Sequence, residues 1–175
     1  MRRIVLVTTG GTIEKTYDER TGELANRRSI VHRMLDELRL EGVEVDVVEL
    51  MSKDSLEMDD EDRRQIVETV RSALDSGGGD GLAGVVILHG TDTLTDTGRR
   101  LDRDIPAPPV AIALTGAMRP FEMKRSDALQ NLTEAIFASQ GLPPGVYCVA
   151  HGRALKFPGV VKDRERGTFH HRAES

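Results

Sequence analysis

A chain of 175 residues, 38% of them hydrophobic, is long enough for one core but short for two ordinary domains, so we predict a single domain over residues 1–175. The net charge of -5 argues against nucleic acid and anionic membranes as primary partners. The lone cysteine, Cys148, excludes an intrachain disulfide and a thiolate zinc cluster, and we expect it in the core. The apolar run behind Arg3 is too short for a signal peptide or a membrane span, so we expect a cytoplasmic protein.

Short apolar runs that end at glycine or polar turns alternate with longer segments of helical period. This pattern is typical of β-α units around a mainly parallel sheet, and hence of the α/β class. Strands are predicted at residues 3–8, 43–50, 84–89, 109–115 and 145–150. Helices are predicted at 29–40, with Ser29 as N-cap, and at 58–76, 93–104 and 125–141. The glycine-rich stretch 77–81 should stop the second helix, and the polar segment 14–27 should form an exposed flap with a turn at Gly22.

Four polar segments follow predicted strands directly. They read "TGGT" at 9–12, "MSKDS" at 51–55, "HGTDT" at 89–93 and "TGAMRP" at 115–120. Because the carboxyl ends of parallel strands meet at one edge of a sheet, where ligands usually bind in open α/β folds, these segments should share a rim. The sequence therefore predicts a binding or catalytic site at this edge.

Hydroxyl groups are prominent in these segments, and Thr12 and Thr91 are candidate nucleophiles. A threonine attacks a carbonyl only with a proton acceptor and a group that polarises its target. Asp92 could hold a lysine or bind a substrate ammonium, and backbone N–H groups near Gly11 and Gly90 could stabilise an oxyanion. The plainer alternatives are a turn hydroxyl for Thr12 and a loop or capping carboxylate for Asp92.

A lysine can act as the base only when its amine is neutral. On chemistry alone, four lysines compete for that role: Lys15, Lys124, Lys156 and Lys162.

The order of the motifs narrows these alternatives. "TTGGTIEK", "HGTDTLTDTG", "TGAMRP" and "VVKDRERGTF" occur in the order found in the amino-terminal domain of the bacterial-type L-asparaginases, and the chain resembles that domain over essentially its whole length. The resemblance implies a three-layer, flavodoxin- or Rossmann-like fold. It also implies an amidohydrolase that releases L-aspartate and ammonia from L-asparagine, with L-glutamine as a poorer substrate, and that needs no metal or organic cofactor.

Carried over residue by residue, the resemblance implies catalytic roles for five side chains. Thr12 matches the nucleophile that forms an aspartyl ester, and Tyr17 resembles the flap tyrosine that orients or deprotonates it. Thr91 matches the second threonine, near the attacked amide, and Asp92 the aspartate on the substrate α-amino group. Lys162 is similar in position to the lysine that completes a Thr-Lys-Asp arrangement.

Substrate binding is expected to involve Gly11, Gly90 and Asp92, and Ser52 matches the family's serine near the substrate α-carboxylate. The sequence departs from the family around the lysine, where "ALKFPGVVK" leaves Lys156 as a rival. Longer family members carry a second domain that supplies an acidic residue to a neighbour's site. We therefore expect this chain, as a short form of the N-terminal domain alone, to form a homodimer or higher homo-oligomer.

Two other function classes compete with the amidohydrolase. A dinucleotide- or phosphate-binding module is disfavoured because "GGTIEK" lacks the later glycine of G-x-G-x-x-G and no Walker sequence occurs. A catalytically silent amino-acid-binding or regulatory domain is the stronger alternative.

The histidines give no sign of a metal site. His89 is expected to support its loop rather than bind a metal, and His170 and His171 lack matching acidic ligands.

Overall fold

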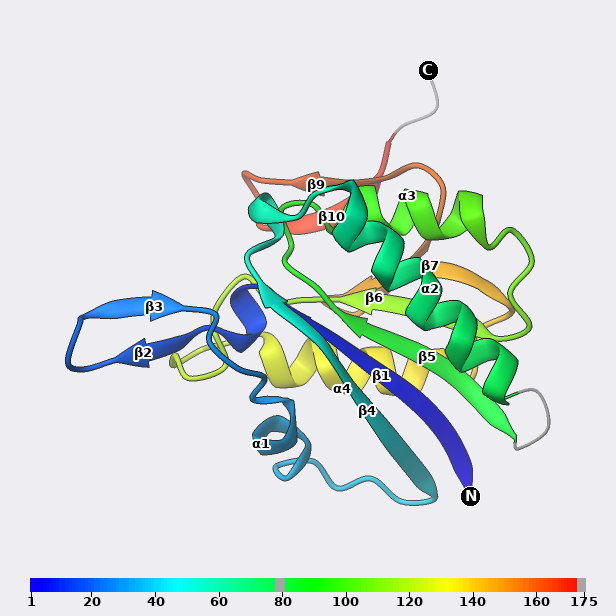
Figure 1. Cartoon of the computed structure of the whole chain (residues 1–175), viewed down its shortest axis with the longest axis horizontal. Coiled ribbons are helices and arrows are strands. Elements are labelled where there is room, and N and C mark those ends of the chain that lie inside the picture. Colours follow the sequence, from blue (N-terminus) through cyan, green and yellow to red (C-terminus); the bar gives the residue numbers. More distant parts are fainter. Residues whose placement is uncertain (78–80, 173–175) are drawn as a thin grey trace.

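The computed structural model describes residues 1–77 and 81–172 (Figure 1). The described residues form a six-stranded sheet in the order β4-β1-β5-β6-β7-β8. Its strands are β1 (Arg2–Gly10), β4 (Val43–Lys53), β5 (Leu82–Leu88), β6 (Ala111–Thr115), β7 (Gly145–Ala150) and β8 (Arg153–Lys156). All neighbours pair in parallel except β7 and β8. The predicted mainly parallel α/β fold is confirmed, and the order of the five parallel strands is that of flavodoxin.

Helices cover both faces of the sheet (Figure 1). On one face lie α2 (Asp60–Gly77) and α3 (Leu94–Asp104), and on the other lie α1 (Val31–Leu35) and α4 (Ala128–Ser139). Because side chains alternate along a strand, Val5 and Val7 of β1 enter the first core, whereas Ile4 and Leu6 enter the second. Cys148 of β7 is fully buried, as predicted, and burial raises the pKa of its thiol to about 12.

The first predicted helix was wrong in length. Instead of covering residues 29–40, α1 has five residues. After the C-cap of this helix the backbone hydrogen bonds span three residues, as in isolated turns; one example is the bond from the Leu38 N–H to the Leu35 carbonyl. Ile30, not Ser29, occupies the N-cap position. The other three helices lie within a few residues of their predicted bounds. Of the predicted stop at 77–81, residues 78–80 lie outside the described residues.

Two small hairpins were not predicted as strands. The segment expected as a flap contains β2 (Thr16–Asp18) and β3 (Glu23–Ala25), which pair antiparallel and project from the layered body (Figure 1). Gly22 lies in their turn with φ 74°. The second hairpin, β9 (Val160–Asp163) and β10 (Thr168–His171), lies beside α3. Two short 3₁₀ helices, η1 (Thr12–Glu14) and η2 (Ser55–Glu57), follow β1 and β4.

Candidate active site

The loops after β1 and β5 meet where the strand order reverses, which is the usual ligand crevice of an open α/β sheet. A Cβ added to Gly11, whose φ is 81°, would lie 2.4 Å from the N and Cα atoms of Gly90. Only glycine permits so close a backbone approach. Because Thr12 and Thr91 are the next residues in each loop, this contact brings the two candidate threonines to one crevice.

Thr12 begins η1 and is half-buried. Its hydroxyl makes no hydrogen bond within the described part of the chain, so it is free of a structural role there. The Gly11 N–H, in contrast, donates to the carbonyl of Lys53 at 2.8 Å. That N–H is therefore already used, and the expected oxyanion donor at Gly11 is not available in this conformation.

Thr91, Asp92 and Lys162 form one hydrogen-bonded group. The Lys162 ammonium donates to Thr91 Oγ1 at 2.8 Å and to Asp92 Oδ1 at 2.9 Å. β9 delivers Lys162 to this point, and its neighbour across the hairpin, Phe169, is anchored in the core. The hydrogen bond from Lys162 is the main reason that the pKa of Asp92 lies below its usual value.

The structure also separates the competing lysines. Lys162 begins the charged stretch "KDRER" at 162–166, but its side chain is only 14% exposed and therefore does not face solvent. Lys156 is exposed on β8, with its amine 5.9 Å from the centre of the Tyr147 ring. Lys15 pairs with Asp54 at 2.7 Å, and Lys124 is exposed. Among these lysines, Lys162 is the one hydrogen-bonded to Thr91 in the part of the chain that the structure describes.

Ser52 lies near the end of β4 and lines a small pocket of about 260 Å³ beneath the β2–β3 hairpin. Its Oγ is buried and has no hydrogen-bond partner among the described residues. A buried hydroxyl without a partner is unfavourable, so it is a natural place for a ligand to supply one. The Ser52 hydroxyl is therefore available to a ligand in this pocket.

Tyr17 is not brought to the threonines. Its side chain is 57% exposed and faces a wide groove of about 920 Å³ that Arg33 and Glu122 also line. Its backbone N–H donates to Glu122 Oε2 at 3.1 Å, and no hydrogen bond joins its hydroxyl to Thr12 within residues 1–77 and 81–172. In this conformation the expected contact between Tyr17 and the nucleophile is absent.

Glu14, in the 3₁₀ helix η1 that follows β1, is fully buried. Its carboxylate accepts hydrogen bonds from the N–H groups of Gly10 and Ile30 and from the Ser29 hydroxyl. Burial raises the pKa of Glu14. The side chain ties the end of β1 to the start of α1 and so fixes the loop that carries Thr12.

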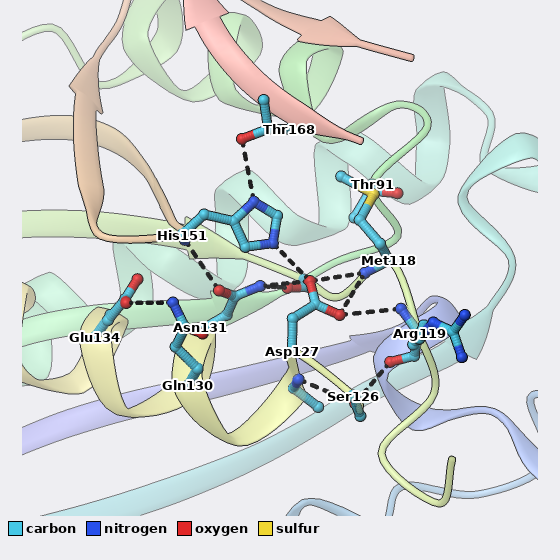
Figure 2. Close-up of polar contacts among 12 residues, drawn as sticks. Thr91, Met118, Arg119, Ser126, Asp127, Gln130, Asn131, Glu134, His151 and Thr168 are labelled. Atoms are coloured by element: carbon cyan, nitrogen blue, oxygen red, sulfur yellow. Dashed lines mark hydrogen bonds and ion pairs between the residues drawn. The ribbon is translucent and has the colours of Figure 1, made fainter. Parts of the chain in front are cut away.

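A second network that sequence reasoning missed holds the "TGAMRP" loop (Figure 2). Asp127 accepts from the backbone N–H groups of Met118 and Arg119, each at 3.0 Å, and from Asn131 and His151. The other His151 nitrogen lies 3.1 Å from the hydroxyl of Thr168 in β10. Asp127, the N-cap residue of α4, and Asn131 are four residues apart, and this spacing could have pointed to a shared side of the helix, but His151 comes from a distant turn.

The two networks converge behind Thr91. A Cβ at Gly116 would lie 2.2 Å from the His89 carbonyl and 3.1 Å from the Thr91 methyl group, so the "TGAMRP" loop packs directly on the "HGTDT" loop. Through Thr168, the same cluster reaches the hairpin that carries Lys162. The arrangement positions the Thr91–Lys162 pair from both sides.

His89 supports its loop, as expected. Nδ1 lies 2.8 Å from the Gly90 carbonyl, which can only accept, so it carries the proton, and Nε2 accepts from the Thr97 hydroxyl. The ring is fully buried, and burial lowers its pKa to about 4.

This lowered pKa predicts an acid-dependent loss of stability. Because the unfolded chain binds a proton near pH 6.5 and the folded chain only near 4, the His89 contribution is complete above pH 6.5 and declines as the pH falls to about 4. We expect a loss of about 3 kcal/mol over that window. Urea unfolding of the wild type and of His89→Gln at pH 7 and pH 4.5 would test this. An equal pH dependence in both proteins would contradict it.

Two further properties of the described residues bear on function. No group of three His, Cys, Asp or Glu side chains among them is placed to hold a metal ion. None of their helices is long and apolar enough to cross a membrane.

Comparison with known families agrees with this geometry. The family model for the N-terminal domain of asparaginase matches residues 3–168, which is nearly the whole chain. The chain belongs to the asparaginase N-terminal domain family. The expected family and fold are therefore confirmed.

Individual relatives show both the likeness and its extent. The L-asparaginase of Thermococcus kodakarensis is 33% identical over 146 residues, which are 83% of this chain and 43% of that enzyme. Its solved structure superposes with a TM-score of 0.85 and 28% identity, covering 99% of this chain and 52% of that one. A glutamyl-tRNA(Gln) amidotransferase subunit of Methanococcus vannielii is 28% identical over 159 residues, 87% of this chain and 35% of that protein. The chain thus spans about half the length of the relatives it matches, or less.

Proposed function

We propose that the chain hydrolyses the side-chain amide of L-asparagine to L-aspartate and ammonia through a threonine ester, with L-glutamine as a poorer substrate. The observation that carries the proposal is the Thr91–Lys162–Asp92 group, which lies where the loop of Thr12 closely approaches the loop of Thr91. Among the described residues, the Thr12 hydroxyl has no hydrogen-bond partner. Membership of the asparaginase family and the likeness to the Thermococcus enzyme support it.

In the proposed reaction, Thr12 Oγ1 attacks the amide carbon, the C–N bond breaks, and the Thr12 proton leaves with the amide nitrogen as ammonia. Water then cleaves the ester and restores the hydroxyl. Lys162 donates to Thr91 Oγ1, so the Thr91 hydroxyl hydrogen is not used in that contact and can form a hydrogen bond to the departing nitrogen, without being transferred to it. Ser52 would bind the substrate α-carboxylate, and Asp92 its α-ammonium.

Tyr17 enters this scheme through motion of the β2–β3 hairpin. The hairpin projects from the layered body (Figure 1), and Leu24 and Ala25 of β3 line the same pocket as Ser52. We propose that it closes on the substrate and carries Tyr17 toward Thr12.

The proposal is tested by ammonia release from L-asparagine and from L-glutamine by the purified chain. We expect turnover of asparagine to exceed that of glutamine. Binding of L-aspartate without any turnover would favour a silent amino-acid-binding domain instead. Preference for glutamine would contradict the proposed order of substrates.

Assembly and location belong to the same proposal. Phe137 on α4 is 80% exposed, beside a groove lined partly by Leu40, Val43 and Ile136. An exposed aromatic side chain in such surroundings is suited to burial between two copies of the chain, so we propose a homodimer or higher homo-oligomer. We also propose that the protein is located in the cytoplasm. Light scattering at assay concentration should give at least twice the chain mass, and Phe137→Glu should lower it. A monomeric wild type with full activity would contradict the assembly.

A further inference from the structure

Arg164 has no role in the proposed reaction, yet it contacts the site. It follows β9 directly, and its guanidinium donates to Asp92 Oδ1 at 2.8 Å. This is the same oxygen that Lys162 contacts at 2.9 Å. Two cationic side chains therefore share one oxygen of the carboxylate that the proposed function assigns to the substrate α-ammonium.

The turn that presents Arg164 is well defined. The Asp163 carboxylate accepts from the N–H groups of Glu165 and Arg166 at 3.1 and 3.0 Å, and Gly167 closes the turn with φ 60°. Side-chain hydrogen bonds of this kind hold the backbone of a turn. The guanidinium is thus offered to Asp92 from the solvent side, with its side chain 67% exposed.

A substrate ammonium and the Arg164 guanidinium are like charges that need the same anion. If the ammonium replaces Arg164, that ion pair is lost. If it uses the other oxygen of Asp92, it lies beside a positive charge. Either arrangement weakens binding of an amide with a free α-ammonium, whereas an amide without one avoids the conflict.

We propose that Arg164 is a specificity-determining residue that disfavours amides carrying a free α-ammonium relative to those that lack one, such as succinamate or N-acylated asparagine. This inference rests on the proposed function, because it takes Asp92 as the ammonium site.

The test compares Arg164→Gln with Arg166→Gln, which removes the same charge from the same turn. Among the described residues, the Arg166 guanidinium pairs only with Asp163, at 3.8 Å. Asparagine and succinamate differ only in the α-ammonium. In Arg164→Gln we expect kcat/KM for asparagine to rise about fivefold, mainly through KM, because an exposed ion pair is worth up to about 1 kcal/mol. In the same variant, kcat/KM for succinamate should change less than twofold. In Arg166→Gln, kcat/KM for both substrates should also change less than twofold. Arg164→Lys should keep kcat/KM values close to those of the wild type.

A binding measurement separates this inference from the reaction itself. In titration calorimetry, Arg164→Gln should raise the affinity for L-aspartate about fivefold relative to the affinity for succinate. If no protein releases ammonia but this shift appears, the proposed hydrolysis fails and the role of Arg164 stands. The inference is wrong if Arg164→Gln changes the affinities for aspartate and succinate by the same factor, or changes kcat/KM for asparagine and succinamate by the same factor.

Discussion

Replacing Thr12 by alanine should reduce kcat for asparagine by about 10³-fold or more, because the residue would supply the only bond-forming atom of the first step. The fold should survive. The Thr12 hydroxyl makes no hydrogen bond to the described residues, so its removal should cost less than about 0.5 kcal/mol of folding free energy. Ammonia release and urea unfolding of the same preparation measure both effects.

Two control variants sharpen that experiment. Thr12→Ser keeps a hydroxyl at the same point and should retain measurable turnover. Thr16→Ala removes a threonine from β2, in the adjoining hairpin, and should stay within a few-fold of wild type. A Thr12→Ala protein with near-normal turnover would remove Thr12 from the mechanism.

Replacing Lys162 by methionine should have the second large effect, again about 10³-fold on kcat. The change deletes the donor to both Thr91 and Asp92 while keeping an unbranched side chain of similar length. Because Asp92 then loses the main cause of its lowered pKa, that pKa should rise toward its ordinary value. Folding stability should fall by about 1–3 kcal/mol, so circular dichroism must accompany the rate measurement.

Lys156→Met is the matched control for this variant. Lys156 is exposed and lies over the Tyr147 ring rather than in the crevice, so its loss should change turnover less than twofold. The reverse result, with Lys156→Met inactive and Lys162→Met active, would show that the lysine was assigned to the wrong position.

The parallel sheet was predictable because its inner strands β1, β5 and β6 are largely continuous apolar runs, buried on both faces, with a glycine at or soon after the end of each. The helix at 29–40 was overestimated because its apolar period continues past Leu35, whereas the backbone there already turns back toward β4. Residues 162–166, "KDRER", form a charge run that by itself gives no sign of a strand. Their hairpin is fixed by Phe169 entering the core, a tertiary contact that local pattern does not reveal.

The same distinction applies to the candidate site. Thr12, Thr91 and Asp92 follow strand ends, so their convergence could be inferred from topology alone. The contacts of Arg164 and His151 could not, because each depends on a turn whose direction is set by residues far away in the sequence. Tyr17 could be placed on the flap, but its orientation depends on where the hairpin rests.

The central claim is that Thr12 forms an ester with the substrate acyl group. It is tested most directly by acid-quenching the enzyme during turnover of L-asparagine and mapping its peptides by mass spectrometry. We predict an added aspartyl group on the peptide that contains Thr12, absent from Thr12→Ala and formed without modification of Thr91. An aspartyl group on Thr91 instead, or steady ammonia release with no modified peptide under conditions that preserve esters, would contradict it.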